Sequence, residues 1–512
     1  MLDDQQDVIA FLSDPSSYGQ GIDAVEIIET HVSLVFLAGD CAYKLKRAVK
    51  YPYLDFSTAE RRRRACEAEL TLNRRTAPAI YLEIRGIGRT STGDIAFCAS
   101  DTAVDWVVVM RRFDQSLLFD ALARSGGLSA QLMDALADHI GSFHATAERY
   151  FDRGGAAEMA ELAEIQYRCL AAAQHSGSPR GRVDELRKRW RERLTAVSVL
   201  LDRRREAGKV RHCHGDLHLR NICLFDGKPT LFDCLEFDDA LASIDVLYDL
   251  AFLLMDLEHR GLVNSANRVF NRYLDRAEED DGLAAVPLFL SLRAAIRAHV
   301  TASVIGRGTR SEAGQEMASE ARRYLDFAHR SLQQEPGRLI AIGGVSGTGK
   351  STLAAALAPE LGPRPGARIL RSDVTRKLLL GVAPETRLSA GAYTRETSCH
   401  VYDTLCRKAA VGLAAGYSVI IDAVALTPEE RGSFAAVART AAVPFSGFWL
   451  EGPAVTLANR IQARRGDASD ATAQVLTEQL RHDPGPIEWI RIDAGAGAED
   501  CLAAVQRALA AD

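Results

Sequence analysis

Two aspartates and an asparagine in HCHGDLHLRNICLFDGKPTLFD, residues 212–233, have types and spacing that could do chemistry. Asp216 and Asn221 lie five residues apart, and Asp233 follows after two short strand-like runs. An aspartate can accept or orient the proton of an attacking hydroxyl group, and asparagine and aspartate oxygens can fix Mg²⁺ against phosphates. The set therefore predicts phosphoryl transfer, with Asp216 as the catalytic residue and Asn221 and Asp233 as metal ligands.

A second phosphate-binding pattern of an unrelated kind stands at residues 343–352, GGVSGTGKST. It completes the Walker A pattern G-x-x-x-x-G-K-S between an apolar strand and the start of a helix. The glycines let backbone N–H groups turn toward phosphates, while the lysine reaches the β- and γ-phosphates and the serine ligates Mg²⁺. The predicted nucleotide-binding residues are Gly344, Ser346, Gly347, Thr348, Gly349, Lys350, Ser351 and Thr352, of which Ser351 is also a predicted metal ligand.

Carboxylates beyond this loop could complete a second reaction centre. Asp373 follows the next strand in RSDVTRK, and Asp422 ends the strand after that. The arrangement resembles small P-loop kinases of the gluconate kinase, chloramphenicol phosphotransferase, zeta-toxin and polynucleotide kinase type. The resemblance implies that Asp373 orients or deprotonates the acceptor hydroxyl. Asp422 is the predicted metal ligand, as a Walker B group, although the sequence does not separate the roles of the two aspartates.

Arginines in ANRIQARRGDASDA, residues 458–471, are candidates for a lid over this centre. Arg460 and Arg464 are four residues apart and share a helix face, so both could reach one phosphate chain. The resemblance implies that such arginines neutralise charge on the transferring group, and both are predicted catalytic residues. A solvated basic helix is the alternative.

The first motif carries a resemblance of its own. Its Asp-to-Asn interval is that of the H-R-D-x-x-x-x-N loops of kinases. The pattern H-G-D-x-H-x-x-N, with FDCLEFD after it, resembles the aminoglycoside phosphotransferase family and its choline- and homoserine-kinase-like relatives over about residues 30–330. The resemblance implies a protein-kinase-like fold in which a strand lysine contacts the nucleotide phosphates and pairs with a helix glutamate.

Lys44 and Glu69 are the residues predicted for these two roles in nucleotide binding. Lys44 follows CAY on a strand, as in V-A-I-K, and Glu69 begins an apolar-periodic helical run. Lys46 and Glu67 remain open as alternatives. The segment VVVMRRF, residues 107–113, would hold adenine through backbone contacts.

Two features depart from the kinase pattern. The segment VFLAGDCAY supplies one glycine where kinases have G-x-G-x-x-G, and Phe232-Asp233-Cys234 lacks the glycine of D-F-G. Glu236 could add to the metal or acceptor site, whereas Asp249 is expected to brace the catalytic loop. The basic run Arg61–Arg64 is interpreted as a solvated helix face with glutamate partners.

Hydrophobic periodicity predicts the elements that position these residues. Two strands joined at Gly39-Asp40 are expected within residues 30–50, and a helix capped by Ser57 or Thr58 is expected over residues 57–78. From LIAIGGV onward, strands and helices alternate, which indicates a parallel sheet with crossover helices. The other predicted segments are strands up to residue 113, helices over 115–207 and 243–332, and short strands at 210–213, 222–225 and 230–233.

These patterns predict a two-domain protein that combines α+β and α/β folds. Residues 1–332 would form the kinase-like domain, with an N-lobe over about 1–112 and a helical C-lobe over about 113–332. QQEPGR, residues 333–338, would be a linker, and residues 339–512 a P-loop kinase domain with a parallel sheet flanked by helices. A chain of 512 residues is long enough for two or three such cores.

Composition is that of an average globular protein, with 47% hydrophobic and 25% charged residues. The net charge of −6 argues against a protein that coats nucleic acid. The ten cysteines include no C-x-x-C pair, and the N-terminus does not resemble a signal peptide. No long uninterrupted apolar run indicates a membrane span. A cytoplasmic location is expected.

The whole chain looks like a tandem phosphotransferase that uses ATP and Mg²⁺ to phosphorylate hydroxyl groups of small-molecule acceptors at two sites. Three rival interpretations remain open. The first half could regulate the P-loop half without activity of its own. The P-loop half could phosphorylate 5′ ends of nucleic acids, or it could act as a nucleotide-driven switch.

Overall fold

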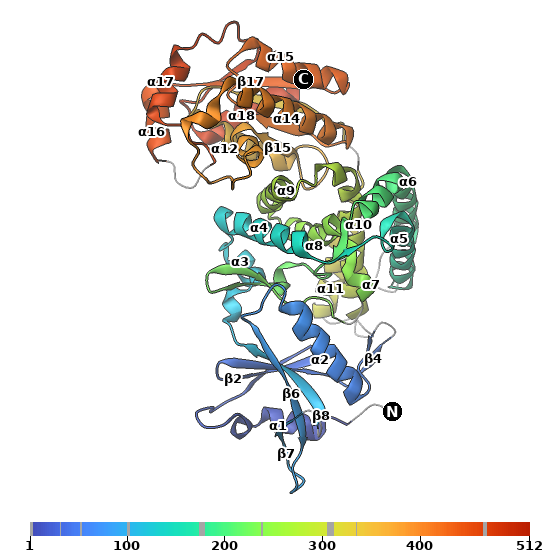
Figure 1. Ribbon diagram of the computed structural model, residues 1–512. Helices are drawn as coiled ribbons and strands as arrows, with labels where there is room; N and C mark the ends of the chain where they lie inside the picture. Colours follow the sequence, from blue (N-terminus) through green and yellow to red (C-terminus); the bar gives the residue numbers. More distant parts are fainter. Residues whose placement is uncertain are drawn as a thin grey trace. The chain divides into compact units, whose positions relative to one another are not determined.

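Figure 1 shows the computed structural model of the chain. Internal contacts divide it into two compact units, Met1–Gly154 with Arg205–Leu253, and Gly155–Arg204 with Leu254–Asp512. The second unit therefore combines helices from before the predicted linker with the P-loop half. The structure describes residues 4–30, 32–51, 54–99, 103–173, 180–236, 239–304, 312–333, 335–463 and 468–511.

The first unit begins with an antiparallel sheet of six strands in the order β1-β2-β3-β8-β6-β7. The predicted hairpin at Gly39-Asp40 is confirmed, since Ala38 of β2 pairs with Cys41 of β3. One face of the sheet packs against the short helix α1 (Gln6–Ser13), and α2 (Ala59–Asn73) lies along the sheet in Figure 1. The strands are β1 (Glu26–Glu29), β2 (Ser33–Ala38), β3 (Cys41–Lys46), β6 (Tyr81–Arg89), β7 (Ile95–Cys98) and β8 (Ala103–Arg111).

Helix α2 starts where the sequence predicts, because the Thr58 side chain accepts a hydrogen bond from the Arg61 N–H. The interpretation of Arg61–Arg64 as a solvated face is wrong for Arg62, which is 1% exposed. Its guanidinium binds both carboxylate oxygens of Asp105 on β8, at 2.8 and 2.9 Å. This bidentate pair fixes the helix to the centre of the sheet.

The remainder of the first unit carries the catalytic-loop motif between short strands and helices. The antiparallel hairpin β11–β12 (Ile222–Phe225 and Lys228–Leu231) follows the motif. Helix α8 (Val246–His259) crosses into the second unit. The other elements here are η1 (Pro15–Tyr18), β4 (Lys50–Tyr51), β5 (Leu54–Asp55), η3 (Gln115–Leu117), α3 (Phe119–Ser125), α4 (Ala130–Thr146), β9 (Arg149–Tyr150), β10 (Val210–His212), η5 (Leu219–Asn221), α7 (Asp239–Ala242) and β13 (Ser243–Asp245).

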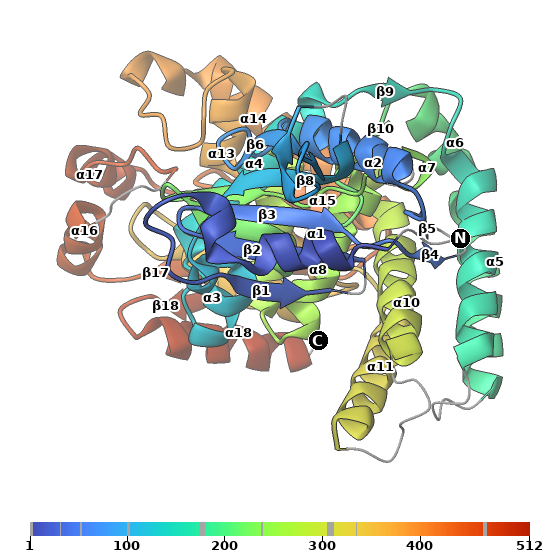
Figure 2. The ribbon, with the colours of Figure 1, turned by 90° about the horizontal axis from the view of Figure 1, so that it is seen from below.

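The second unit contains a helical layer, in which α10 and α11 lie side by side (Figure 2). Among the described residues, the segment Asp280–Ser303 is long and apolar enough to cross a membrane, but 72% of its apolar window is buried inside the protein. That burial is typical of a core helix of a globular protein. The helices are α5 (Gly155–Ala172), α6 (Arg180–Glu206), α9 (Val263–Ala277), η6 (Asp280–Ala285), α10 (Val286–Val304) and α11 (Glu312–Ser331).

The second unit also contains the predicted parallel sheet, with strand order β15-β16-β14-β17-β18. Both faces are covered by helices, as the predicted crossovers require. The predicted α+β and α/β fold classes are thus confirmed. The strands are β14 (Leu339–Gly343), β15 (Arg368–Arg371), β16 (Val419–Asp422), β17 (Phe445–Glu451) and β18 (Ile490–Asp493). The helices are α12 (Lys350–Leu357), η7 (Ala358–Glu360), α13 (Ser372–Leu379), η8 (Ala390–Tyr393), α14 (Arg395–Ala414), α15 (Pro428–Thr440), α16 (Ala454–Ala463), α17 (Ala473–Arg481) and α18 (Ala498–Ala511).

Candidate active sites

Lys44 forms two ion pairs in the first unit. Its Nζ lies 2.7 Å from Glu69 Oε1 and 2.5 Å from Asp233 Oδ1. Glu69 is on the buried face of α2, whereas the alternative glutamate, Glu67, pairs with Arg63 on the exposed face. The structure therefore brings three residues of the predicted set together, although they are far apart in the sequence.

Lys46, the alternative lysine, enters the same buried cluster. It lies on the same face of β3 as Lys44, with its Nζ 2.5 Å from Glu69 Oε2, and it also pairs with Glu236. Burial opposes the charge of both lysines, but Asp233 and Glu69 raise the pKa of Lys44, and Glu236 and Glu69 raise that of Lys46. Both lysines are thus held as ammonium groups.

The carboxyl groups of this cluster differ in their pKa. Burial alone would raise the pKa of Glu69, but Lys44 and Lys46 hold it below its ordinary value. Burial dominates at Glu236, and it raises the pKa of that carboxyl group. Glu69 is therefore the fixed anion of the cluster, and Glu236 is the group that gains a proton more readily.

Asp216 lies in the loop before η5, with its side chain 38% exposed. The Asn221 side-chain amide donates to Asp216 Oδ2 at 2.9 Å, and His218 Nε2 lies 3.3 Å from the same oxygen. The amide nitrogen of Asn221 thus faces Asp216, so its carbonyl oxygen is the atom with the chemistry to ligate a metal. The loop holds a carboxylate that remains open to an acceptor.

The two predicted metal ligands, Asn221 and Asp233, flank the hairpin β11–β12 at its open end. Asn221 precedes β11 and Asp233 follows β12, and the Phe232 N–H donates to the Asn221 carbonyl at 3.0 Å. The Asp233 N–H donates to the Tyr81 hydroxyl oxygen at 3.1 Å. Asp233 has φ +59°, a left-handed conformation that aspartate tolerates better than most side chains.

Asp249 braces the catalytic loop, as expected from the sequence. Its buried carboxylate accepts hydrogen bonds from the N–H groups of His214, at 3.1 Å, and Gly215, at 2.9 Å. His144 Nε2 lies 3.1 Å from the same carboxylate. These contacts fix the backbone immediately before Asp216. His214 Nε2 also lies 3.0 Å from the Phe232 carbonyl, which links the catalytic loop to the segment that carries Asp233.

In the second unit, the phosphate-binding loop connects β14 to α12. Gly344 has φ +127°, and a Cβ atom there would lie 2.3 Å from the Leu450 carbonyl oxygen. Gly347 and Gly349 have φ +89° and +90°. Glycine is thus required at 344 by both conformation and space. The loop ends at the N-terminus of α12. The first backbone N–H groups of a helix point toward its N-terminus and favour a phosphate there.

The residues after the loop gather at the carboxyl end of the sheet. The Ser351 hydroxyl donates to Asp422 Oδ2 at 2.5 Å, and an Arg371 guanidinium N–H donates to Ser351 Oγ at 3.0 Å. Lys350 Nζ donates hydrogen bonds to the carbonyl oxygens of Gly344 and Val345, at 2.8 and 3.1 Å. Ser351 and Asp422 offer adjacent oxygen atoms, a donor set that suits Mg²⁺.

Two loop residues of the predicted set have other contacts. The Ser346 N–H donates to the side-chain oxygen of Gln479 on α17, at 2.8 Å. The Thr348 hydroxyl donates to the Val345 carbonyl, also at 2.8 Å. These contacts hold the shape of the loop. Because the Ser346 N–H already has an acceptor, a phosphate that bound this group would have to displace Gln479.

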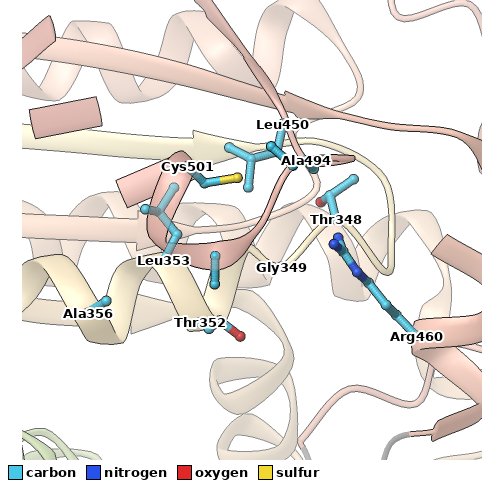
Figure 3. Close-up of a pocket in the computed structure, with 11 residues that line it drawn as sticks. Thr348, Gly349, Thr352, Leu353, Ala356, Leu450, Arg460, Ala494 and Cys501 are labelled. Carbon is cyan, nitrogen blue, oxygen red and sulfur yellow. The ribbon is translucent and has the colours of Figure 1, made fainter. Parts of the chain in front are cut away.

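A pocket of about 190 Å³ lies beside the loop, and Thr352 lines it on the α12 side. Arg460 on α16 extends toward Thr348 at the edge of this pocket (Figure 3). The structure thus places Arg460 near the phosphate-binding loop. Arg464, its predicted companion, lies outside the described residues.

Asp373 is the second residue of helix α13, two residues after Arg371. Burial raises the pKa of Asp373, and a hydrogen bond from Ser469 partly opposes this shift. The next residue after Ser469, Asp470, accepts a hydrogen bond from the Tyr393 hydroxyl at 2.8 Å and lies 3.3 Å from Nζ of the buried Lys377. The last part of the predicted lid segment, with Ser469 and Asp470, therefore lies close to Asp373.

Comparisons with known proteins match a different family to each of the two candidate sites. Residues 95–286 match the model of the phosphotransferase enzyme family, and residues 339–484 match that of an AAA domain. Uncharacterized proteins of Mycobacterium tuberculosis and Mycobacterium bovis are each 32% identical over 461 residues, which cover 88% of both chains. The chain belongs to the family of these mycobacterial proteins. It is a phosphotransferase with two kinase-like domains, and such domains imply ATP as the phosphoryl donor.

Solved structures of kinases are similar to parts of the chain. A gluconokinase from Sinorhizobium meliloti is 22% identical, covers 34% of this chain and 95% of its own, and has a TM-score of 0.25. A choline/ethanolamine kinase family protein from Mesorhizobium loti is 13% identical, covers 63% of this chain and 97% of its own, and has a TM-score of 0.39.

Some contacts at the two candidate sites were not predicted from the sequence. Lys46 was considered only as an alternative to Lys44, but both lysines bind Glu69. The alternation of β3 places both on one face, so that signal was present. Gln479 lies 133 residues from Ser346, and Asp470 lies 93 residues from Lys377, so no local pattern indicates them.

Proposed function

We propose that this phosphotransferase has two separate active sites, each of which transfers the γ-phosphoryl group of ATP to a hydroxyl group of a small-molecule acceptor. One observation supports the proposal. In each half, a lysine, oxygen atoms that could ligate a metal and a carboxylate that could face an acceptor come from one short set of motifs. A chain with one working site would have no need of the second complete set.

In the first site, Lys44 would bind the nucleotide phosphates while Glu69 holds its ammonium group in place. Asp216 would accept or orient the proton of the acceptor hydroxyl, because its carboxylate is partly exposed and fixed by Asn221. Asp233 would exchange its contact with Lys44 for a metal ligand role when nucleotide binds. This is the arrangement that kinases with a catalytic Asp and a metal-binding Asn and Asp use.

In the second site, the backbone N–H groups at the start of α12 and Lys350 would hold the β- and γ-phosphates. Arg371 and Arg460 would neutralise charge on the phosphates. Asp373 would orient the acceptor hydroxyl. Its raised pKa makes it a better proton acceptor than an ordinary exposed carboxylate. Arg464 remains a proposed partner of Arg460.

Mg²⁺ fits the oxygen donors in both sites, Asn221 with Asp233 and Ser351 with Asp422. When bound, it would neutralise charge on the phosphates and help to align them. We further propose a cytoplasmic enzyme, which agrees with the ten free cysteines. The net charge of −6 favours small acceptors over nucleic acid.

The test is a screen of metabolite extracts with γ-labelled ATP and the intact protein. It compares the wild type with Asp216→Asn and with Lys350→Ala. Each variant should lose at least one labelled product by about 100-fold or more, and the two should lose different products. Asp226→Asn and Lys228→Ala are the matched controls, because both residues are exposed at the turn of the β11–β12 hairpin and should leave all products unchanged.

The other outcomes assign the rival interpretations. If Asp216→Asn changes no product while Lys350→Ala abolishes all of them, the first half is a regulatory module. If labelled oligonucleotides are the products of the second site, its acceptors are nucleic-acid ends. If ATP is hydrolysed at equal rates with and without extract, the P-loop half is a switch and the proposal fails for that site.

A further inference from the structure

Strand β15 is at the edge of the parallel sheet, and two asparagines of α9 cover its open side. Asn271 Oδ1 accepts the Ile369 N–H at 2.7 Å, and Asn271 Nδ2 donates to the Ala367 carbonyl at 3.1 Å. Asn267 Nδ2 donates to the Ala367 carbonyl as well, at 3.1 Å. An edge strand leaves such backbone groups unpaired. The side chains of α9 thus take the place of a neighbouring strand.

A buried charge cluster adjoins these asparagines. Arg368, the first residue of β15, is 0% exposed, and it lies 2.5 Å from Asp275 of α9 and 2.7 Å from Asp280 of η6. Lys408 of α14 lies 3.0 Å from the other oxygen of Asp280. Burial opposes the charge of Arg368, but Asp275 and Asp280 raise its pKa. A buried arginine of this kind is tolerated only with its carboxylate partners in place.

A third contact reaches the loop on the acceptor side. Arg272 of α9 binds Glu385 through both nitrogens of its fork, at 2.7 and 3.2 Å. Three residues later in this loop, the Leu388 N–H donates to Asp470 at 3.1 Å. Asp470 also accepts from Tyr393 and pairs with Lys377. The contact from α9 therefore continues, through one short loop, to the segment that lies beside Asp373.

The side chains of α9 and η6 in these contacts come before the predicted linker, yet those of Asn271, Asp275 and Asp280 meet the strand that leads into Arg371 and Asp373. Helix α9 lies next to the P-loop half in Figure 1 and contacts α12, α13 and η7. Arg368 is three residues before Arg371 and five before Asp373. A shift at the start of such a short strand would displace both side chains, and a displacement near 1 Å is costly in an active site.

We propose that α9 and η6, which precede the P-loop half in the chain, are positioning elements of the P-loop active site. Asn271, Asp275, Asp280 and Arg272 hold β15 and the loop after α13, and so set the position of Arg371 and Asp373. The catalytic part of this inference rests on the proposed function, whereas the order imposed on β15 does not.

The first test measures hydrogen exchange by mass spectrometry in the full chain. Asn271→Ala removes the acceptor of the Ile369 N–H and a donor to the Ala367 carbonyl, so exchange over residues 367–373 should rise about tenfold. Asn264→Ala is the matched control, because Asn264 is an exposed asparagine on the same helix. Equal exchange in the two variants would overturn the proposal.

The second test measures Lys350-dependent phosphotransfer. In Asn271→Ala and Asp280→Asn, kcat/KM for the acceptor should fall about tenfold or more, while the affinity of the P-loop half for Mg-ATP stays within about twofold. Asp280→Glu, which keeps the charge, should recover part of the loss. Faster exchange with unchanged acceptor kcat/KM would overturn the positioning role, because the contacts would then only stabilise the fold.

The two tests separate this inference from the proposed function. If the wild type makes no Lys350-dependent product, the proposed function fails for this site. The exchange experiment still decides whether α9 orders β15. If exchange is unchanged but activity falls equally in Asn271→Ala and the Asn264→Ala control, the proposal also fails.

Discussion

Glu69 is a single carboxylate that serves two lysines. Lys44 and Lys46 both lie within 2.7 Å of its oxygens, and its side chain is 0% exposed. Buried ion pairs contribute little compared with apolar contacts, but the removal of one partner leaves uncompensated charge. We therefore expect substitution of Glu69 to lower the free energy of unfolding and to weaken nucleotide binding.

We expect Glu69→Gln to lower the free energy of unfolding by about 3 kcal/mol at pH 7. Burial opposes ionisation of Glu69, but the two lysines depress its pKa in the folded state. Its contribution is therefore fully present above the ordinary value of 4.5 and is lost as pH falls through the folded pKa. Denaturant unfolding at pH values from 7 to 3 should show the gap between wild type and variant closing only below about pH 4.5.

Glu67→Gln is the control, because Glu67 is 45% exposed on the same helix. Its effect should stay within about 0.5 kcal/mol at every pH. A gap for Glu69→Gln that stays constant from pH 7 to pH 3 would contradict the assignment of Glu69 as a depressed, ionised carboxylate.

At the scale of single residues, the sequence predicted what local spacing determines. Asp216 with Asn221 and the Walker A glycines depend on short motifs with known intervals. The Lys44–Glu69 pair was predicted from the resemblance to kinases, with Lys46 and Glu67 left open. The second role of Lys46, the position of Glu236 and the burial of Arg62 depend on which residues meet across the fold. A run of four arginines looks uniform in sequence, and only Asp105 on β8 distinguishes Arg62 from the others.

At the scale of elements, two glycines of the phosphate-binding loop are needed for different reasons. Gly344 must be glycine to fit against β17, because its Cβ would meet the Leu450 carbonyl at 2.3 Å. A Cβ at Gly349 would meet no neighbouring side chain within 4 Å, and Gly349 lines the pocket beside the loop, where we propose that a phosphate binds. Gly344 is thus needed for the fold, whereas Gly349 would serve the proposed ligand.

We expect Gly344→Ala to destabilise the P-loop half by about 3 kcal/mol. Gly349→Ala should cost only about 1 kcal/mol, from its left-handed φ, but should weaken Mg-ATP binding at this site by about tenfold or more. Thermal unfolding together with titration of a non-hydrolysable ATP analogue distinguishes the two variants. Equal losses of stability would show that the contact with Leu450 relaxes.

Element prediction was best where periodicity is strong and worst at sheet edges. The hairpin of β2 and β3, helix α2 and the strands β14 to β16 all lie where the sequence predicts them. Strand β18 was not predicted, because its four residues are mostly exposed and follow a loop-like stretch rich in proline and glycine. Edge strands need less apolar surface, so they leave a weaker signal.

For the whole molecule, the proposed pair of sites predicts a binding stoichiometry. The wild type should bind two equivalents of Mg-ATP analogue per chain in isothermal titration calorimetry, and Lys350→Ala should bind one. The reason is that Lys350 serves only the P-loop site, whereas Lys44 serves the other. One equivalent in the wild type, lost in Lys350→Ala, would mean that the first half does not bind nucleotide.

The sequence suggests a division of the chain at the predicted linker, residues 333–338, but the compact units of the structure do not divide there. Asn271 and Arg368 join α9 to β15, and Gly155–Arg204 belongs to the same compact unit although it comes much earlier in the chain. No single cut can therefore release the second unit whole. A fragment that starts at the linker would lack α9 and η6, so the edge of β15 would lose its asparagine partners and Arg368 would lose Asp275 and Asp280. The two sites are therefore better separated in the intact chain, by a substitution that inactivates one of them.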